Sequence, residues 1–268
     1  MRPSAARRLV RARGEQGRGS QATDAPSPSR SHAGGLAANG TALAPQAKIA
    51  PPPIADQIVV RKRLLRALDD ACDVITVCAP AGFGKTTLLA DWVRTSPDVV
   101  TAWVNLDSDD NDPRRLWSAV ACAVAASPDV PIDHPIASSW RWPTAQPGYL
   151  AELVEALREL ERPVRLILED AHELSGPHVM HGLDVLIRNR PTNVVLVLSS
   201  RCALAAVSRL GPTGTLRELH VDDMRFSMNE TAELLDKADL HPTPEQLTAL
   251  QKRAPMAGPQ VSASLLWR

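Results

Sequence analysis

The fold of this 268-residue chain is decided by residues 74–87, which read Val74-Ile75-Thr76-Val77-Cys78-Ala79-Pro80-Ala81-Gly82-Phe83-Gly84-Lys85-Thr86-Thr87. The β-branched run over 74–78 predicts a buried strand, and the residues over 86–94 predict a helix. Between them, glycines let the backbone approach an anion closely, and free amides at the helix N-terminus favour phosphate oxygens. The order of strand, loop and helix therefore predicts a phosphate-binding loop.

The residues of this loop have separate expected roles. Lys85 would bridge the β- and γ-phosphates of a nucleotide, and the Thr86 hydroxyl would complete the shell of a Mg²⁺ ion. The usual pattern G-x-x-x-x-G-K-[ST] has glycine where this chain has Ala79, which is acceptable if that residue keeps φ below zero. The residues expected to contact the nucleotide are Ala79, Gly82, Phe83, Gly84, Lys85, Thr86 and Thr87.

Short apolar runs alternate with helical periodicity on either side of the loop. The further expected elements are strands over 99–104, 164–168, 193–198 and 216–221, a helix from Pro113, and helices over 150–160, 229–237, 244–253 and 262–267. Near-continuous apolar strands separated by helices indicate a parallel sheet covered on both faces. The predicted fold class is α/β, a P-loop NTPase sheet flanked by helices and followed by a small, mostly helical, winged-helix-like annex.

Composition and charge divide the chain into three predicted parts. Residues 1–53 are rich in Ala, Gly, Ser, Pro and Arg and are expected to be a disordered basic extension, either a plain flexible segment or an arm that touches nucleic acid. Residues 54–226 form the predicted nucleotide-binding domain, and 227–268 an incomplete annex. Beyond residue 50 there are 22 basic and 28 acidic residues, a balance that disfavours a broad DNA-binding face.

The sequence also excludes several classes of protein. No stretch approaches 18 uninterrupted apolar residues, so no transmembrane helix is expected, and the N-terminus lacks the apolar core of a secretory signal. The four cysteines lie far apart without C-x-x-C spacing, so neither a disulfide nor a zinc site is expected. The chain is therefore predicted to be a reduced cytoplasmic protein.

Charged residues follow two of the predicted strands. Glu169 and Asp170 close the strand over 164–168, where Glu169 would hold Mg²⁺ together with Thr86 and Asp170 would polarise the attacking water. Arg201 closes the strand over 193–198 and would contact the γ-phosphate. The alternatives are that the two acids cap the next helix and that Arg201 is a solvated arginine at a strand end.

Three other groups of residues have simpler explanations. His172, His178 and His181 lack a convincing further metal ligand. The acids over 107–112 resemble a calcium loop but lack its central glycine, and capping of the helix from Pro113 explains them better. Trp92, Trp103 and Trp117 occupy apolar positions and are expected in the core.

Several blocks of sequence, taken in order, resemble the LuxR-type large ATP-binding regulators, which are STAND-class ATPases. The blocks are Val60-Arg61-Lys62-Arg63-Leu64, residues 79–89, Ala102-Trp103-Val104-Asn105-Leu106-Asp107 with 109–113, Leu166-Ile167-Leu168-Glu169-Asp170-Ala171-His172, Leu198-Ser199-Ser200-Arg201 and 222–227. The resemblance implies ATP or ADP binding with Mg²⁺, slow hydrolysis at most, and a nucleotide switch that acts through the annex. In the family, sensor repeats and a DNA-binding helix-turn-helix follow, so this chain is expected to be a truncated or short member.

Three departures from the family pattern leave other functions open. Glu169-Asp170 replaces an Asp-Asp pair, no proline follows Arg201 within 202–204, and 254–259 reads Ala-Pro-Met-Ala-Gly-Pro in place of Gly-Trp-Pro-Ala-Gly-Leu. The alternative is a catalytically inactive nucleotide-binding scaffold, or a non-functional fragment, acting through a protein partner or self-association. A P-loop kinase is a further alternative, although 127–147 offers no basic cluster for an acceptor. No recognition helix is apparent, so sequence-specific DNA binding by this chain is not expected.

Overall fold

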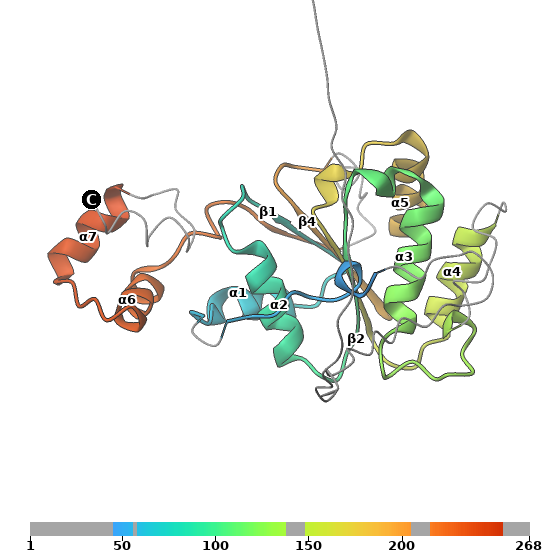
Figure 1. The fold of residues 1–268 in the computed structure, drawn as a ribbon, viewed down its shortest axis with the longest axis horizontal. Coiled ribbons are helices and arrows are strands. Elements are labelled where there is room, and N and C mark those ends of the chain that lie inside the picture. Colours follow the sequence, from blue (N-terminus) through green and yellow to red (C-terminus); the bar gives the residue numbers. More distant parts are fainter. Residues whose placement is uncertain (1–44, 56–57, 138–147, 205–214, 254–268) are drawn as a thin grey trace, which may run out of the picture. The chain divides into compact units, whose positions relative to one another are not determined.

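The computed structural model describes residues 45–55, 58–137, 148–204 and 215–253. Their centre is a five-stranded parallel sheet with the order β2-β3-β4-β1-β5 (Figure 1). The strands are β1 (Val74–Cys78), β2 (Val100–Asn105), β3 (Val164–Glu169), β4 (Val194–Ser200) and β5 (Leu216–Leu219). The sequence-predicted α/β class and the P-loop NTPase type of sheet are both confirmed.

The register of the sheet brings the carboxyl ends of the strands to one edge. Cys78 at the end of β1 is paired with Ser200 at the end of β4, and Asn105 at the end of β2 is paired with Glu169 at the end of β3. Since β4 lies between β1 and β3, the loop that follows β1 and the acids that end β3 are separated by one strand. Ligands of open α/β sheets bind at this edge.

Alternation of side chains along the strands divides the core into two layers. Val74, Leu166 and Leu198 pack with one group of helices, and Ile75, Val77 and Ile167 with another. Figure 1 shows the same division, with α3, α4 and α5 on one face and α1 and α2 on the other. The helices are α1 (Lys62–Asp69), α2 (Lys85–Thr95), α3 (Pro113–Ala125), α4 (Tyr149–Arg158), α5 (Pro177–Asn189), α6 (Met228–Lys237) and α7 (Pro244–Arg253).

The expected elements compare closely with the observed ones, with two omissions. The helices α1 and α5 are not expected from the sequence, whereas every expected strand is present to within two residues at each end. The described residues also form 3₁₀ turns at Gln46–Lys48, Ser108–Asn111 and Ala171–Glu173. None of the helices in the described part of the chain is long and apolar enough to cross a membrane.

Some expectations fall outside what the structure describes. Residues 1–44 of the predicted basic extension, the predicted helix over 262–267 and the departure at 254–259 all lie there. Residues 227–253 contain the helices α6 and α7, as expected, but no strand, so the winged-helix form of the annex stays a prediction. The three predicted domain boundaries are also predictions still.

Candidate functional site

The loop between β1 and α2 depends on two glycines with positive φ. Gly82 has φ of 84° and Gly84 has φ of 76°, and Gly84 is the N-cap of α2. These backbone conformations favour glycine because a Cβ atom would be strained there. Among the described non-glycine residues only Asp170 and Asp239 have positive φ, so Ala79 has the negative φ that its methyl group requires. The loop thus exposes the amides of the first turn of α2, which is the geometry that binds anions.

Lys85 begins α2 and turns its side chain back along the loop. Its Nζ donates hydrogen bonds to the carbonyl oxygens of Ala79 at 2.8 Å and Pro80 at 3.3 Å. The residue is only 7% exposed, and burial lowers the pKa of its ammonium group, while Glu169 and Asp170 partly oppose that change. An anion in the loop would favour the charged form of Lys85 further, because opposite charges stabilise one another.

Thr86 and Glu169 meet directly at the carboxyl edge of the sheet. The Thr86 hydroxyl donates a hydrogen bond to Oε1 of Glu169, while Oε2 of the same carboxylate is buried without a hydrogen-bond partner. Burial raises the pKa of Glu169, and the hydrogen bond from Thr86 lowers it in part. A hydroxyl and a carboxylate in contact are the hard oxygen ligands that Mg²⁺ takes, and the unpartnered buried oxygen has coordination capacity to spare. The residues present therefore fit a Mg²⁺ ion.

Asp170 and Arg201 lie together on the neighbouring strand ends. Nε of Arg201 is 3.8 Å from Oδ1 of Asp170, and Nδ1 of His172 is 3.6 Å from the same oxygen. Asp170 has φ of 56°, an uncommon left-handed conformation that asparagine and aspartate tolerate best. The structure thus brings all three of the predicted catalytic residues, Glu169, Asp170 and Arg201, to the edge that carries the phosphate loop.

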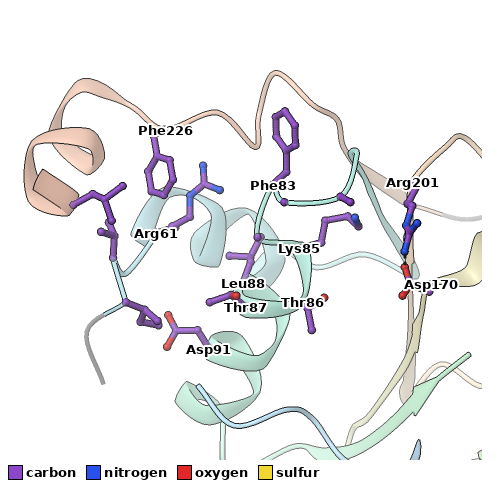
Figure 2. A pocket seen from close by; sticks show the side chains of 16 residues that line it. Arg61, Phe83, Lys85, Thr86, Thr87, Leu88, Asp91, Asp170, Arg201 and Phe226 are labelled. Carbon is purple, nitrogen blue, oxygen red and sulfur yellow. Dashed lines mark ion pairs between the residues drawn. The ribbon is translucent and has the colours of Figure 1, made fainter. Parts of the chain in front are cut away.

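One cavity of about 470 Å³ joins the phosphate loop to a second, more apolar region. Its size is within the range of small-ligand sites. Figure 2 shows Lys85 and Thr86 between the Asp170–Arg201 pair on one side and Arg61 with Phe226 on the other. The apolar end is lined by Ile58, Val59, Leu88, Phe226 and Leu234, together with Arg61 and Asp91.

Arg61 is a site residue to which sequence reasoning assigned no role. Its Nη2 donates to the carbonyl oxygens of Met224 at 2.9 Å and Arg225 at 2.8 Å, and its guanidinium carbon lies 4.7 Å from the centre of the Phe226 ring. Glu230 lies 3.6 Å away, and burial lowers the pKa of Arg61 although Glu230 opposes this. Its Nε and Nη1 are buried without hydrogen-bond partners, and the residue lines this end of the cavity.

Arg61 could not have been found from sequence spacing. Its partners follow it by more than 160 residues, and the one signal is its place in the block Val60–Leu64, which contributed only to the family resemblance. The capping box that begins α6 is local by comparison, because Ser227 and Glu230 exchange hydrogen bonds three residues apart.

The groups that sequence analysis explained in simpler terms lie outside the cavity. Asp112 caps α3 by accepting a hydrogen bond from the Arg114 amide at 2.9 Å, with Pro113 at the first helical position, as expected. The tryptophans Trp92, Trp103 and Trp117 are at most 4% exposed, which confirms that they are core residues. His178 and His181 are exposed on α5, and the described residues contain no group of three side chains that could hold a metal through His, Cys, Asp or Glu alone.

Comparison with known proteins agrees with this geometry. The family model described as an AAA domain matches residues 68–203, which is 136 of the 268 residues. The chain belongs to the AAA domain family. Members of this family are P-loop ATPases, so nucleotide binding is the function that the family establishes for the domain, and an AAA domain commonly binds its nucleotide with Mg²⁺.

Solved structures are similar to this AAA domain in fold. A STAND protein with a tetratricopeptide repeat sensor from Pyrococcus horikoshii is 15% identical, with a TM-score of 0.55, and the match covers 77% of this chain and 29% of that one. Cdc6p from Pyrobaculum aerophilum matches at 17% identity with a TM-score of 0.44, covering 72% and 54% of the two chains. The Orc1 protein of Aeropyrum pernix in complex with DNA is 18% identical with a TM-score of 0.44, and the match covers 76% of this chain and 56% of that one. This chain thus spans less than two thirds of each.

Proposed function

We propose that this chain is the ATP-binding switch domain of a LuxR-type transcriptional regulator, which binds ATP or ADP with Mg²⁺ and hydrolyses ATP slowly. The observation that carries the proposal is the single cavity that joins the phosphate loop to the apolar end beside Arg61. A nucleotide has the same two halves, a polyanionic tail and a flat apolar base. The ordered blocks that resemble this family of regulators support the finer assignment.

Each end of the cavity would bind a different part of the nucleotide. The amides around Gly82 and Gly84 and the Lys85 ammonium hold the phosphates, and Thr86 with Glu169 holds Mg²⁺. Bound Mg²⁺ would supply charge neutralisation at the phosphates. The purine packs beside Phe226 and Arg61, which line the other end of the cavity. Because Phe226 directly precedes the annex and Leu234 lies in its helix α6, bound nucleotide favours the docked annex, and this is the proposed switch.

Calorimetry with ATP and ADP in millimolar Mg²⁺ tests nucleotide binding. Lys85→Ala removes the charged contact to the phosphates, so ATP affinity should fall by about 2–3 kcal/mol, roughly 30- to 150-fold. The matched control is Lys62→Ala, because Lys62 is exposed and does not line the cavity. Unchanged affinity in Lys85→Ala, or no heat from either nucleotide with the wild-type protein, contradicts the proposal.

An inactive nucleotide-binding scaffold is the second candidate, and the surroundings of Asp170 favour it. The Asp170 carboxylate lies 3.8 Å from Nε of Arg201, so a neighbouring cation competes with a water molecule for it. Steady-state phosphate release separates the two candidates. Turnover that disappears in Asp170→Asn with nucleotide affinity retained supports the ATPase, and binding without turnover in the wild-type protein supports the scaffold.

The regulator assignment needs a different test. If the domain belongs to a LuxR-type regulator, the coding sequence beyond Arg268 should encode helical repeats followed by a helix-turn-helix. A coding sequence that continues into another kind of domain overturns that part of the proposal and leaves nucleotide binding untouched.

A further inference from the structure

Two cysteines lie near the base of the phosphate loop, Cys78 at the end of β1 and Cys202 two residues beyond the end of β4. Cys78 ends β1 and is the Cα partner of Ser200 at the end of β4, and the amide of Ala79 donates to the Ser200 carbonyl oxygen at 3.2 Å. Because side chains alternate along a strand, Cys78 shares a face with Val74, and Ser200 shares that same face with Leu198. The Cys78 thiol and the Ser200 hydroxyl therefore stand next to each other on the sheet.

The chain that follows β4 places the Cys202 backbone against the Ser200 hydroxyl. The Ser200 hydroxyl accepts a hydrogen bond from the Cys202 amide at 3.2 Å and donates to the Cys202 carbonyl oxygen at 2.6 Å, which turns the chain at the end of the strand. Leu204 then packs against the core on the face that carries Cys78.

The exposure of the two thiols differs. Burial raises the pKa of the Cys78 thiol. Cys202 is exposed and directly follows Arg201, whereas Cys78 is half-buried. An exposed thiol beside a cation is the more accessible to oxidants, and a second thiol nearby can resolve the oxidised sulfur.

We propose that Cys78 and Cys202 form an oxidisable thiol pair, and that the bond between them weakens nucleotide binding by displacing the segment that carries Arg201. A peroxide oxidises Cys202 to the sulfenic acid and is itself reduced, with loss of water or an alcohol. The Cys78 thiolate then attacks the Cys202 sulfur, the S–S bond forms and water leaves. A thiol reductant restores both thiols. Reversible bonds of this kind occur in reducing compartments, where permanent disulfides are rare.

The geometry explains why the bond would alter the site. A disulfide holds its two Cα atoms about 4.4–6.8 Å apart, and Cys202 lies two residues beyond Ser200, the Cα partner of Cys78. Bond formation therefore draws Cys202 toward β1 and takes the adjoining Arg201 away from Asp170. At the other end, Cys78 adjoins Ala79, whose carbonyl oxygen accepts the Lys85 hydrogen bond. The effect on affinity rests on the proposed function, but bond formation does not.

Peptide mapping of the full chain tests bond formation without any nucleotide. Trypsin leaves Cys72 and Cys78 together on residues 67–85 and Cys202 on residues 202–209, so a Cys72→Ser background makes the assignment unique. After mild hydrogen peroxide treatment, we expect the two peptides to be linked, and dithiothreitol to separate them. The variant that also carries Cys202→Ser should give no linked peptide, and Cys122, which is buried, should stay reduced. Failure of the two peptides to link, or a bond to Cys122, overturns the proposal.

Calorimetry on the same samples tests the consequence. ATP affinity in millimolar Mg²⁺ should fall at least about fivefold on oxidation, recover with dithiothreitol, and stay constant through the cycle in Cys202→Ser. Equal affinity of the oxidised and reduced protein overturns the regulatory part. If the reduced protein binds no nucleotide, the proposed function fails, while peptide mapping still decides whether the thiol pair forms.

Discussion

Replacement of Arg61 by methionine tests the contact that joins the start of α1 to the segment before α6. The guanidinium donates a buried hydrogen bond to the Met224 carbonyl oxygen and a part-buried one to that of Arg225, and it lies within ion-pair distance of Glu230. Each hydrogen bond that involves a charged group contributes about 1.5–3 kcal/mol net. Methionine fills similar space but removes both hydrogen bonds and leaves the Met224 carbonyl group buried without this donor. We therefore expect Arg61→Met to lower the free energy of unfolding by about 3 kcal/mol.

Thermal and urea unfolding of the nucleotide-free protein measure this loss. For a domain of this size, about 3 kcal/mol corresponds to a fall in Tm of roughly 6–12 °C. The matched control is Arg63→Met. Arg63 also donates to the Arg225 carbonyl oxygen, at 3.1 Å, and lies 3.7 Å from Glu230, but its side chain is 47% exposed. Contacts of such an exposed arginine contribute about 0–1 kcal/mol.

The comparison between the two variants shows whether burial determines how much the Arg61 contacts contribute to stability. If Arg61→Met costs no more than Arg63→Met, burial of the Arg61 contacts does not determine how strongly the two segments are joined. If both variants cost about 3 kcal/mol, the arginines act as one surface network, and the distinction drawn from their exposure is wrong.

Three further predictions follow from other contacts of the described residues. Burial disfavours the charged form of Glu169, so Glu169→Gln should raise the Tm of the nucleotide-free protein by a few degrees, whereas the gain in ATP affinity from millimolar Mg²⁺, measured by calorimetry, should fall roughly tenfold. The hydrogen bond from Lys48 lowers the pKa of Asp107 below its ordinary value of 3.8, so this contact stabilises the fold above pH 3.8 and is lost as the pH falls through the lowered pKa. The difference in unfolding free energy between wild type and Lys48→Met should therefore be constant from about pH 5 to 8 and shrink below about pH 4. In Gly182→Ala, the new Cβ would lie 2.7 Å from Cζ2 of the buried Trp117, so urea unfolding should show a loss of about 1–3 kcal/mol despite the better helix propensity of alanine.

The sheet could be predicted from the sequence because its strands are almost wholly buried. All six residues of β3 are buried and four of them are apolar, which marks that strand, and the β-branched run of β1 favours a strand over a helix. Only four residues form β5, and they are mostly part-exposed, so its predicted end at residue 221 is two residues too late.

Helix α5 shows why some elements could not be predicted. A glycine in the middle of a helix costs about 1 kcal/mol relative to alanine, and Gly182 lies near the centre of α5. The same residue is required by tertiary packing, because the Trp117 indole from α3 occupies the space of a side chain there. Local propensity and tertiary packing thus favour different residues at this position, and sequence reasoning has access only to the first.

The candidate site divides in the same way, between a local half and a long-range half. The phosphate loop and Thr86 are contiguous in sequence, and Glu169 is recognisable as the acid that ends an apolar strand. The other half depends on contacts between Arg61 and residues more than 160 positions later. A ligand that contacts both halves of the site binds best when the two halves are docked together. Its binding therefore stabilises the docked arrangement. The sheet holds the phosphate loop in place with or without nucleotide. Bound nucleotide would therefore change the conformation of the chain through the other half, around Arg61, which sequence patterns do not reveal.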